Sequence, residues 1–183
     1  RTAQAAGRTQ IEERMHPWHD TYLDDTSIAT DFPVVIEIPK GSKNKYELDK
    51  ETGLLRLDRV LYSSVHYPAD YGFIPRTLHE DNDPLDILVS INEPTFVGCQ
   101  IDCRPLGVLK MRDRGEPDDK IIAIPANDPF YHDVFDIADM SQHYLKEVEH
   151  FFHIYKDLEG KRVEIVGWEK SEVALKVIQD SIK

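Results

Sequence analysis

The chain has 183 residues, of which 40% are hydrophobic and 31% are charged, a composition typical of folded globular domains. Its 34 acidic residues outnumber the 22 basic residues, so the net charge is −12 and neither nucleic acid nor an anionic membrane is an expected partner. No apolar stretch reaches the ~20 residues that a transmembrane helix needs, and we expect one domain over residues 1–183.

The N-terminal residues 1–15 predict a loose arm rather than a folded element. Most of this segment, RTAQAAGRTQIEER, is rich in Ala, Gly, Thr and Gln, and it contains no apolar core of a signal peptide. We therefore expect a cytoplasmic protein. The alternative is an organelle lumen that the chain reaches before losing a targeting segment.

The predicted strands follow in chain order and are short. PVVIEIP lies between two prolines, and KYELDKETGLLRLDRV has the pattern of a β-hairpin whose loop runs from Asp49 to Gly53. A later strand is expected to bend near Pro105 and Gly107, because neither residue suits the interior of a regular strand. The predicted strands and hairpin cover residues 33–39, 45–60, 86–91, 98–111, 120–125 and 162–168.

Two helices are predicted after most of these strands. Between residues 141 and 158 apolar side chains recur with the helical period, and Gly160 is a suitable stop. Ser171 is a natural N-cap for a second amphipathic helix. Short strands with two amphipathic helices predict an α+β fold that is mainly β, a small barrel with helices packed outside.

The two cysteines, Cys99 and Cys103, lie in one predicted strand. A disulfide or half of a zinc site is one interpretation. However, Cys99, Ile101 and Cys103 alternate with polar Gln100 and Asp102, which gives the strand one apolar face. This pattern favours core cysteines in a reducing compartment.

The stretch HEDNDPLDILV crowds acidic residues immediately before a predicted buried strand. In an extended chain Asp81 and Asp83 share one face, and Pro84 favours the extended conformation of Asp83. With Asp86 they form an oxygen-rich group suited to Mg²⁺ or Mn²⁺. A calcium-binding EF-hand loop does not match, because its required oxygen ligand, glycine and glutamate are missing. The alternative is an acidic, solvated turn that caps a strand.

A second acidic stretch, MRDRGEPDDKIIAIP, also precedes an apolar strand. It contains Asp113, Glu116, Asp118 and Asp119, and a plain surface loop is the alternative to a metal site. If the two acidic loops meet at one end of a barrel, they can hold more than one divalent ion.

Basic and phenolic residues gather near the predicted hairpin. Lys45 and Glu47 alternate on one face of its first strand, and Arg59 ends the second. Tyr155 and Lys156 add another hydroxyl and ammonium near the end of the first predicted helix. Ammonium, guanidinium and phenol groups suit phosphate oxygens. The alternatives are solvated basic side chains and tyrosines that pack in the core.

These motifs together resemble the soluble family I inorganic pyrophosphatases. DNDPLDILV is similar to the family signature D-x-D-P-x-D followed by two apolar residues. The resemblance covers residues 33–180 through further blocks in the family's order: VVIEIPKGSKNKYELDKETGLLRLDRVL, YPADYGFIPRTL, RPLGVLKMRDRGEPDDKIIAIP and HFFHIYKDLEGKRVEIVGWE. It implies a five-stranded OB-like β-barrel with flanking α-helices, and Mg²⁺-dependent hydrolysis of pyrophosphate to two orthophosphates by direct attack of a metal-activated water.

The resemblance also implies roles for individual residues. Asp83 matches the general base, or the residue that orients the attacking water. Asp118 rather than Asp119 is taken as a metal ligand, because it keeps the D-x-K spacing with Lys120. The implied metal ligands are Asp81, Asp86, Asp118, Asp113 and, for an extra ion, Glu37. The implied phosphate-binding residues are Lys45, Arg59, Tyr71, Lys120, Tyr155 and Lys156. Further implied cavity residues are Glu47, Asp58 and Tyr67.

One residue departs from the family pattern. Arg114 places a positive charge beside Asp113, where the family often has a neutral or acidic residue. We therefore expect looser metal binding at Asp113, because a neighbouring cation disfavours a second cation.

The implied cofactor is Mg²⁺, several ions per site, with Mn²⁺ as a substitute, and the implied ligands are pyrophosphate and phosphate. The resemblance further implies a homo-oligomer, with a hexamer favoured and a dimer as the alternative. Two other functions are considered: a metal-dependent phosphatase for organic phosphate esters or nucleotides, and a non-catalytic module that binds divalent ions or polyanions. The combination of Asp83, Lys45 and Arg59 disfavours the second of these.

Overall fold

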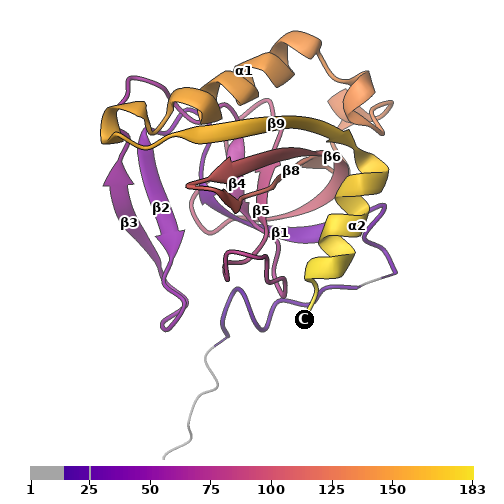
Figure 1. The fold of residues 1–183 in the computed structure, drawn as a ribbon. Coiled ribbons are helices and arrows are strands. Elements are labelled where there is room, and N and C mark those ends of the chain that lie inside the picture. Colours follow the sequence, from indigo (N-terminus) through magenta and orange to yellow (C-terminus); the bar gives the residue numbers. More distant parts are fainter. Residues whose placement is uncertain (1–14, 25) are drawn as a thin grey trace, which may run out of the picture.

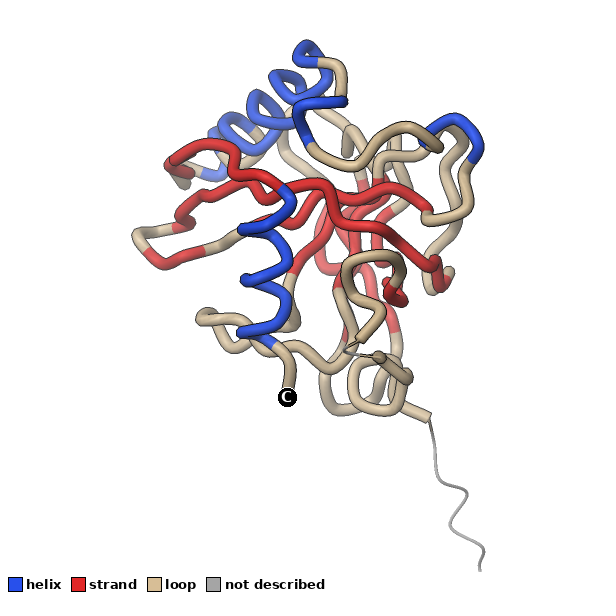
Figure 2. The backbone as a smooth tube through the Cα atoms, turned by 90° about the vertical axis from the view of Figure 1, so that its right-hand side faces the viewer, coloured by secondary structure: helices blue, strands red, loops and turns tan. Residues whose placement is uncertain are grey.

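The computed structural model describes residues 15–24 and 26–183 (Figures 1 and 2). Of the predicted loose arm, residues 1–14 lie outside the described residues, and Met15 is exposed. The described chain forms a closed ring of strands with helices on its outside.

Five strands close into a barrel (Figure 1). Neighbouring strands are antiparallel except β5 and β8, which run parallel, and the pairing of β1 with β6 closes the ring. The barrel strands are, in ring order, β1 (Phe32–Ile38), β4 (Asp70–Phe73), β5 (Asp86–Val89), β8 (Lys120–Pro125) and β6 (Gln100–Asp113). The predicted five-stranded OB-like barrel is confirmed.

The remaining elements extend or cover this barrel. The predicted hairpin is present and stands to one side of it (Figure 1), and two further strands pair with β6. Both α-helices lie outside the strands (Figure 2), and neither, within residues 15–24 and 26–183, is long and apolar enough to span a membrane. These elements are β2 (Asn44–Leu48), β3 (Leu55–Val60), β7 (Glu116–Pro117), β9 (Val163–Lys170), α1 (Gln142–Ile154), α2 (Ser171–Ser181) and the 3₁₀ turns η1 (Pro129–Tyr131), η2 (Ile137–Asp139) and η3 (Asp157–Glu159).

The long strand β6 bends where the sequence predicts it. Its register against β8 shifts between Pro105 and Gly107. A Cβ atom on Gly107 would lie 2.2 Å from Ile137 Cγ2 and 2.6 Å from the Glu169 carbonyl oxygen, so only glycine allows this approach. The bend lets β6 pair with β1, β8 and β9 along its length.

Helix α1 covers one side of the barrel with its apolar face. Leu145, Val148, Phe151 and Phe152 are buried, and each such side chain contributes roughly 1.5–3 kcal/mol when removed from water. The helix ends at Ile154, four residues before the predicted end at residue 158. The chain continues as the short turn η3, which stops at Gly160 in the left-handed conformation, φ 70°.

The expectation that Ser171 caps helix α2 is wrong. Lys170 holds the N-cap position without a side-chain hydrogen bond, and Ser171 is the first helical residue. The Ser171 backbone N and Oγ both donate to Asp136 Oδ2, at 3.0 and 2.9 Å. A carboxylate that lies 35 residues earlier in the chain therefore satisfies the helix start.

Strand β4 was not predicted, because all four of its residues are buried and show no polar–apolar alternation. The predicted core position of the cysteines is confirmed, and within the described residues both are free thiols. Cys103 is fully buried, and Cys99 is half-buried against the same core.

Candidate active site

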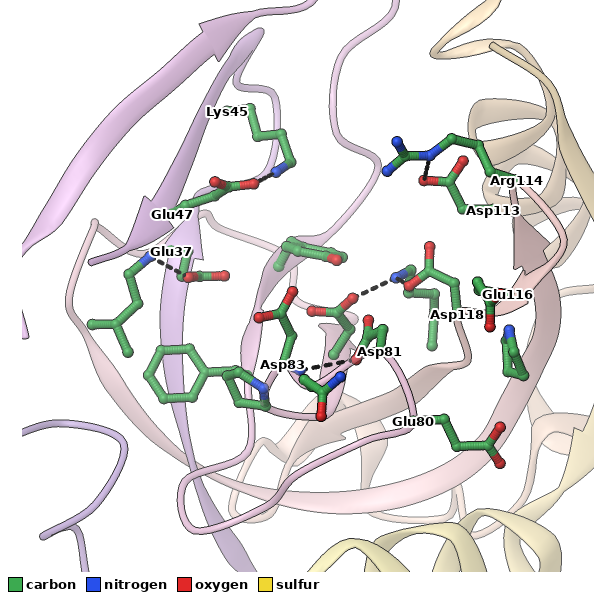
Figure 3. Close-up of a pocket in the computed structure, with 18 of the residues that line it drawn as sticks. Glu37, Lys45, Glu47, Glu80, Asp81, Asp83, Asp113, Arg114, Glu116 and Asp118 are labelled. Atoms are coloured by element: carbon green, nitrogen blue, oxygen red, sulfur yellow. Dashed lines mark hydrogen bonds and ion pairs between the residues drawn. The ribbon is translucent and has the colours of Figure 1, made fainter. Parts of the chain in front are cut away.

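A polar cavity of about 770 Å³ lies between the hairpin, the start of β5 and the loop that joins β6 to β8 (Figure 3). Lys45 and Glu47 enter it from β2, while Asp113 and Arg114 face them from across the cavity. Most residues singled out from the sequence line this one cavity: Glu37, Lys45, Glu47, Arg59, Tyr71, Asp81, Asp83, Asp86, Asp113, Asp118, Lys120, Tyr155 and Lys156. The barrel topology thus brings together residues that are far apart in the sequence, such as Glu37 and Lys156.

Two residues expected in the cavity, Asp58 and Tyr67, are not among those that line it. Asp58 accepts a hydrogen bond from Arg59 Nη1 at 2.7 Å and lies 3.7 Å from Lys45 Nζ. Tyr67 is 2% exposed, and its ring lies 5.4 Å from that of Tyr71. Both residues therefore contact lining residues but do not themselves line the cavity.

A local hydrogen bond and one residue with positive φ fix the conformation of the acidic loop before β5. The Asp83 backbone N donates to Asp81 Oδ1 at 3.0 Å, and Asn82 adopts a positive φ of 64°, which asparagine tolerates. Asp86 then begins the strand. This turn and the start of β5 place Asp81, Asp83 and Asp86 in the lining of one cavity, which agrees with their predicted convergence.

A buried ammonium lies between two of the predicted metal ligands. The register of the parallel pair β5–β8 sets Asp86 opposite Lys120, whose amino group donates to both Asp86 and Asp118. Burial opposes the charge on Lys120, yet Asp86 and Asp118 outweigh burial and raise its pKa. Burial raises the pKa of Asp86. For Asp118 burial is again the largest single effect, but the charge and hydrogen bond of Lys120 and the charge of Lys156 together outweigh it and lower the pKa.

On the opposite side of the cavity, Lys156 Nζ donates to Asp113 Oδ2 at 2.6 Å. Asp113 Oδ1 is buried and has no hydrogen-bond partner among the described residues. Arg114 Nε lies 3.9 Å from Asp113 Oδ2, and its side chain is 74% exposed. A buried carboxylate oxygen that accepts no hydrogen bond is suited to bind a cation. The exposed Arg114 side chain can rotate into solvent when such a cation binds.

Asp118 and Asp119 point to different environments. Asp118 lines the cavity, whereas Asp119 does not. Asp119 is 6% exposed; it accepts a hydrogen bond from Lys110 Nζ at 2.5 Å and lies 3.9 Å from His79 Nε2. This placement agrees with the choice of Asp118 as the ligand.

The cavity carboxylates fit a hard divalent ion by their chemistry. They offer oxygen donors alone, the type that Mg²⁺ prefers. In the described part of the chain, no three acidic, histidine or cysteine side chains are close enough to hold an ion as they stand. Lys120 and Lys156 lie among the carboxylates instead. Ion binding therefore requires these carboxylates to turn from their lysine partners toward the metal.

Glu37 is the most buried of the acidic residues that line the cavity. It is 8% exposed, and its Oε1 accepts a hydrogen bond from the Leu48 backbone N at 2.8 Å. Burial, with a smaller contribution from the charge of Asp86, raises the pKa of Glu37 to about 8. In the metal-free protein Glu37 is thus largely protonated at neutral pH.

This pKa predicts how the stability of the metal-free protein depends on pH. The folded chain keeps the Glu37 proton that the unfolded chain loses above its ordinary pKa of 4.5, so stability falls as the pH rises from 4.5 toward about 8. Glu37→Gln should remove this loss and raise the free energy of unfolding at pH 8 by on the order of 3 kcal/mol. Urea unfolding in EDTA at pH 5 and pH 8 measures it. An identical pH dependence in both proteins would contradict the assignment.

The phenols of the cavity are neutral donors. Burial raises the pKa of Tyr71 and of Tyr155 well above the ordinary value, with nearby carboxylates adding to the effect. Both hydroxyl groups therefore keep their protons and can donate to phosphate oxygens.

Sequence reasoning missed two lysines that line the cavity, Lys50 and Lys161. Lys50 lies in the hairpin turn and forms an ion pair with Asp83. Lys161 follows Gly160 and donates to Glu159 Oε2 at 3.0 Å. The only signal in the sequence is that both lysines lie next to predicted site segments. Solvent-exposed lysines often lie in such places too, so this position does not identify a site residue.

The segment that contains His16 and Trp18 contacts the hairpin turn that carries Lys50. His16 Nε2 lies 3.1 Å from the Lys50 carbonyl oxygen, and Trp18 Nε1 donates to the Thr77 carbonyl oxygen at 2.7 Å. The segment thus joins the hairpin turn to the chain that leads into the acidic loop.

Comparison with known proteins agrees with this geometry. Residues 34–183 match the family model described as inorganic pyrophosphatase. The chain is 56% identical over 147 residues to an inorganic pyrophosphatase of Geobacillus stearothermophilus, covering 80% of this chain and 89% of that protein. It is 52% identical over 167 residues to soluble inorganic pyrophosphatase 3 of Arabidopsis thaliana, covering 91% of this chain and 77% of that protein.

Solved structures give the same result. An inorganic pyrophosphatase from Helicobacter pylori superposes with a TM-score of 0.84 at 45% identity, covering 88% of this chain and 96% of that one. The enzyme from Thermus thermophilus superposes with a TM-score of 0.81 at 42% identity, over 84% of this chain and 90% of that one. The resemblance inferred from the DNDPLDILV motif is therefore confirmed, and the chain belongs to the inorganic pyrophosphatases, a family of hydrolases.

Proposed function

We propose that this chain hydrolyses inorganic pyrophosphate to two orthophosphates with Mg²⁺ as the cofactor. The observation that carries the proposal is one cavity in which a cluster of carboxylates faces a group of ammonium, guanidinium and phenol donors. Pyrophosphate is a compact polyanion, so carboxylates alone would repel it. The proposal resolves this conflict by assigning the acids to cations and the bases to phosphate oxygens.

In this proposal the carboxylates on the β5 and β8 side hold the cations, and Asp113 and Glu37 take further ions. The ligands at the centre are Asp81, Asp86 and Asp118. When bound, divalent ions screen the phosphate charge and lower the pKa of an attacking water. Mn²⁺ is expected to substitute for Mg²⁺, because both prefer oxygen ligands.

Asp83 is proposed to accept the proton of the attacking water. Its side chain reaches the cavity beside Asp81 (Figure 3), and its backbone is fixed by the turn at Asn82. In the substrate-free chain its carboxylate is paired with Lys50. A carboxylate in this position can accept a proton from a water bound in the cavity.

The basic and phenolic residues are proposed to bind and orient the two phosphates. Arg59 offers a planar fork that matches two phosphate oxygens, and Lys45 and Lys156 act as point charges. Tyr71 and Tyr155 remain protonated donors. Stabilising the negative charge on the departing phosphate lowers the barrier for its release.

A comparison of substrates tests this function. Phosphate release with Mg²⁺ should be fast from pyrophosphate and slower by orders of magnitude from ATP and from 4-nitrophenyl phosphate. Comparable rates on the organic substrates would favour a general phosphatase. A thermal shift with Mg²⁺ without any phosphate release would instead favour a non-catalytic binding module.

We further propose a cytoplasmic homo-oligomer, with a hexamer favoured over a dimer, that binds neither nucleic acid nor membranes. The net charge of −12 supports the last two points, because it repels other polyanions. Light scattering coupled to size-exclusion chromatography measures the assembly directly. A mass equal to one chain would contradict the oligomer.

A further inference from the structure

An acidic residue outside the cavity holds two of the cations that line it. Glu159 lies at the end of η3 and its side chain is 6% exposed. One carboxylate oxygen accepts from Arg59 Nε at 2.9 Å, and the other accepts from Lys161 Nζ at 3.0 Å. Arg59 and Lys161 line the cavity, whereas Glu159 does not.

The arrangement fixes the direction in which the Arg59 fork points. Nε is taken by Glu159, and Nη1 donates to Asp58 Oδ2 at 2.7 Å. Within residues 15–24 and 26–183, no side chain or backbone acceptor contacts Nη2. The N–H groups of Nη2, with one of Nη1, are therefore left for a ligand in the cavity.

The same turn connects Glu159 to the substrate-binding end of helix α1. The Glu159 backbone N donates to the Lys156 carbonyl oxygen at 3.0 Å, which ties η3 to the residue that follows Tyr155. Gly160, at φ 70°, turns the chain so that Lys161 reaches the carboxylate two positions before it along the sequence. Arg59, Lys156 and Lys161 are thus held relative to one another through Glu159.

The carboxylate stays charged despite its burial. Burial alone would raise the pKa of Glu159, but the hydrogen bond from Lys161 and the charge of Arg59 outweigh it and lower the pKa. The hydrogen bonds from Arg59 and Lys161 offset the cost of burying this charge, so removing the charge should loosen both partners.

We propose that Glu159 is a positioning residue that aims the Arg59 fork and the Lys161 ammonium at one phosphate group of pyrophosphate. The proposal rests on the proposed function and extends it to a residue that does not touch the substrate. Arg59 and Lys161 are assigned to phosphate oxygens whose negative charge is already present before the P–O bond breaks, so losing their alignment should weaken binding more than it slows chemistry.

Glu159→Gln tests the proposal with the shape of the side chain retained. We expect KM for Mg²⁺–pyrophosphate to rise about tenfold while kcat changes by less than about twofold. Asp157→Asn is the matched control, because Asp157 lies in the same turn but is exposed, and its KM should equal that of the wild type. A drop in melting temperature with an unchanged KM would show a merely structural ion pair and overturn the proposal.

A double-mutant cycle separates positioning from independent effects. Arg59→Lys removes the fork that Glu159 aims, so it should raise KM strongly in the wild type and much less in the Glu159→Gln background. Additive effects on log KM would overturn the proposal. Wild-type protein that releases no phosphate from pyrophosphate would refute the proposed function itself, which is a different outcome from normal hydrolysis with an unchanged KM in Glu159→Gln.

Discussion

Asp83→Asn is expected to lower kcat for pyrophosphate hydrolysis by about 10²–10⁴-fold, the usual contribution of a general base. Asparagine matches the size of aspartate but cannot accept a proton at neutral pH. The fold should survive, because the Asp83 side chain is about half exposed and the hydrogen bond from its backbone N to Asp81 is kept. Steady-state phosphate release with saturating Mg²⁺ measures the effect.

Glu80→Gln is the matched control for this experiment. Glu80 lies in the same acidic loop and lines the cavity but is exposed and has no assigned role. The same loss of one negative charge there should leave kcat close to that of the wild type. If Asp83→Asn keeps a tenth or more of the normal turnover, Asp83 is not the base.

Asp118→Asn is expected to raise the Mg²⁺ concentration for half-maximal rate by about 100-fold or more. Loss of an outer partner of a metal ligand typically costs 10–100-fold, and loss of a ligand should cost no less. The substitution also removes one of the two carboxylates that contact Lys120. Calorimetric titration of Mg²⁺ into the protein provides a reading that does not depend on turnover.

The neighbouring variant Asp119→Asn decides between the two candidate ligands. Asp119 is buried against Lys110 and lies outside the cavity, so this variant should lower the melting temperature. The Mg²⁺ concentration for half-maximal rate should be at least about tenfold lower in Asp119→Asn than in Asp118→Asn. If Asp119→Asn instead weakens Mg²⁺ binding as much as Asp118→Asn does, the ligand assignment is reversed.

The fold was predictable where local patterns are strong. Apolar runs with turn residues at their ends gave β1, β5 and β8, and the Pro105–Gly107 pair gave the bend in β6. Strand β4 escaped, because a fully buried four-residue strand carries no alternation. The cap of helix α2 also escaped, since it comes from Asp136 in a distant segment.

The candidate site was predictable because its acids cluster within short motifs. Asp81, Asp83 and Asp86 fall within six consecutive positions, a density of negative charge that costs stability unless cations offset it. Lys50 and Glu159 are single charged residues in turns, so their sequence context matches that of any solvated side chain. Their roles emerge only from contacts made across the fold, such as the 100-residue separation between Arg59 and Glu159.

We expect this acidic cavity to attract a polyanion only when divalent ions are bound. The most direct measurement is calorimetric titration of methylenediphosphonate, a pyrophosphate analogue without the hydrolysable P–O–P bridge. Titrations are run with Mg²⁺ and then with EDTA. We predict clear binding with Mg²⁺ and none measurable with EDTA. Equal affinity under both conditions would contradict the claim.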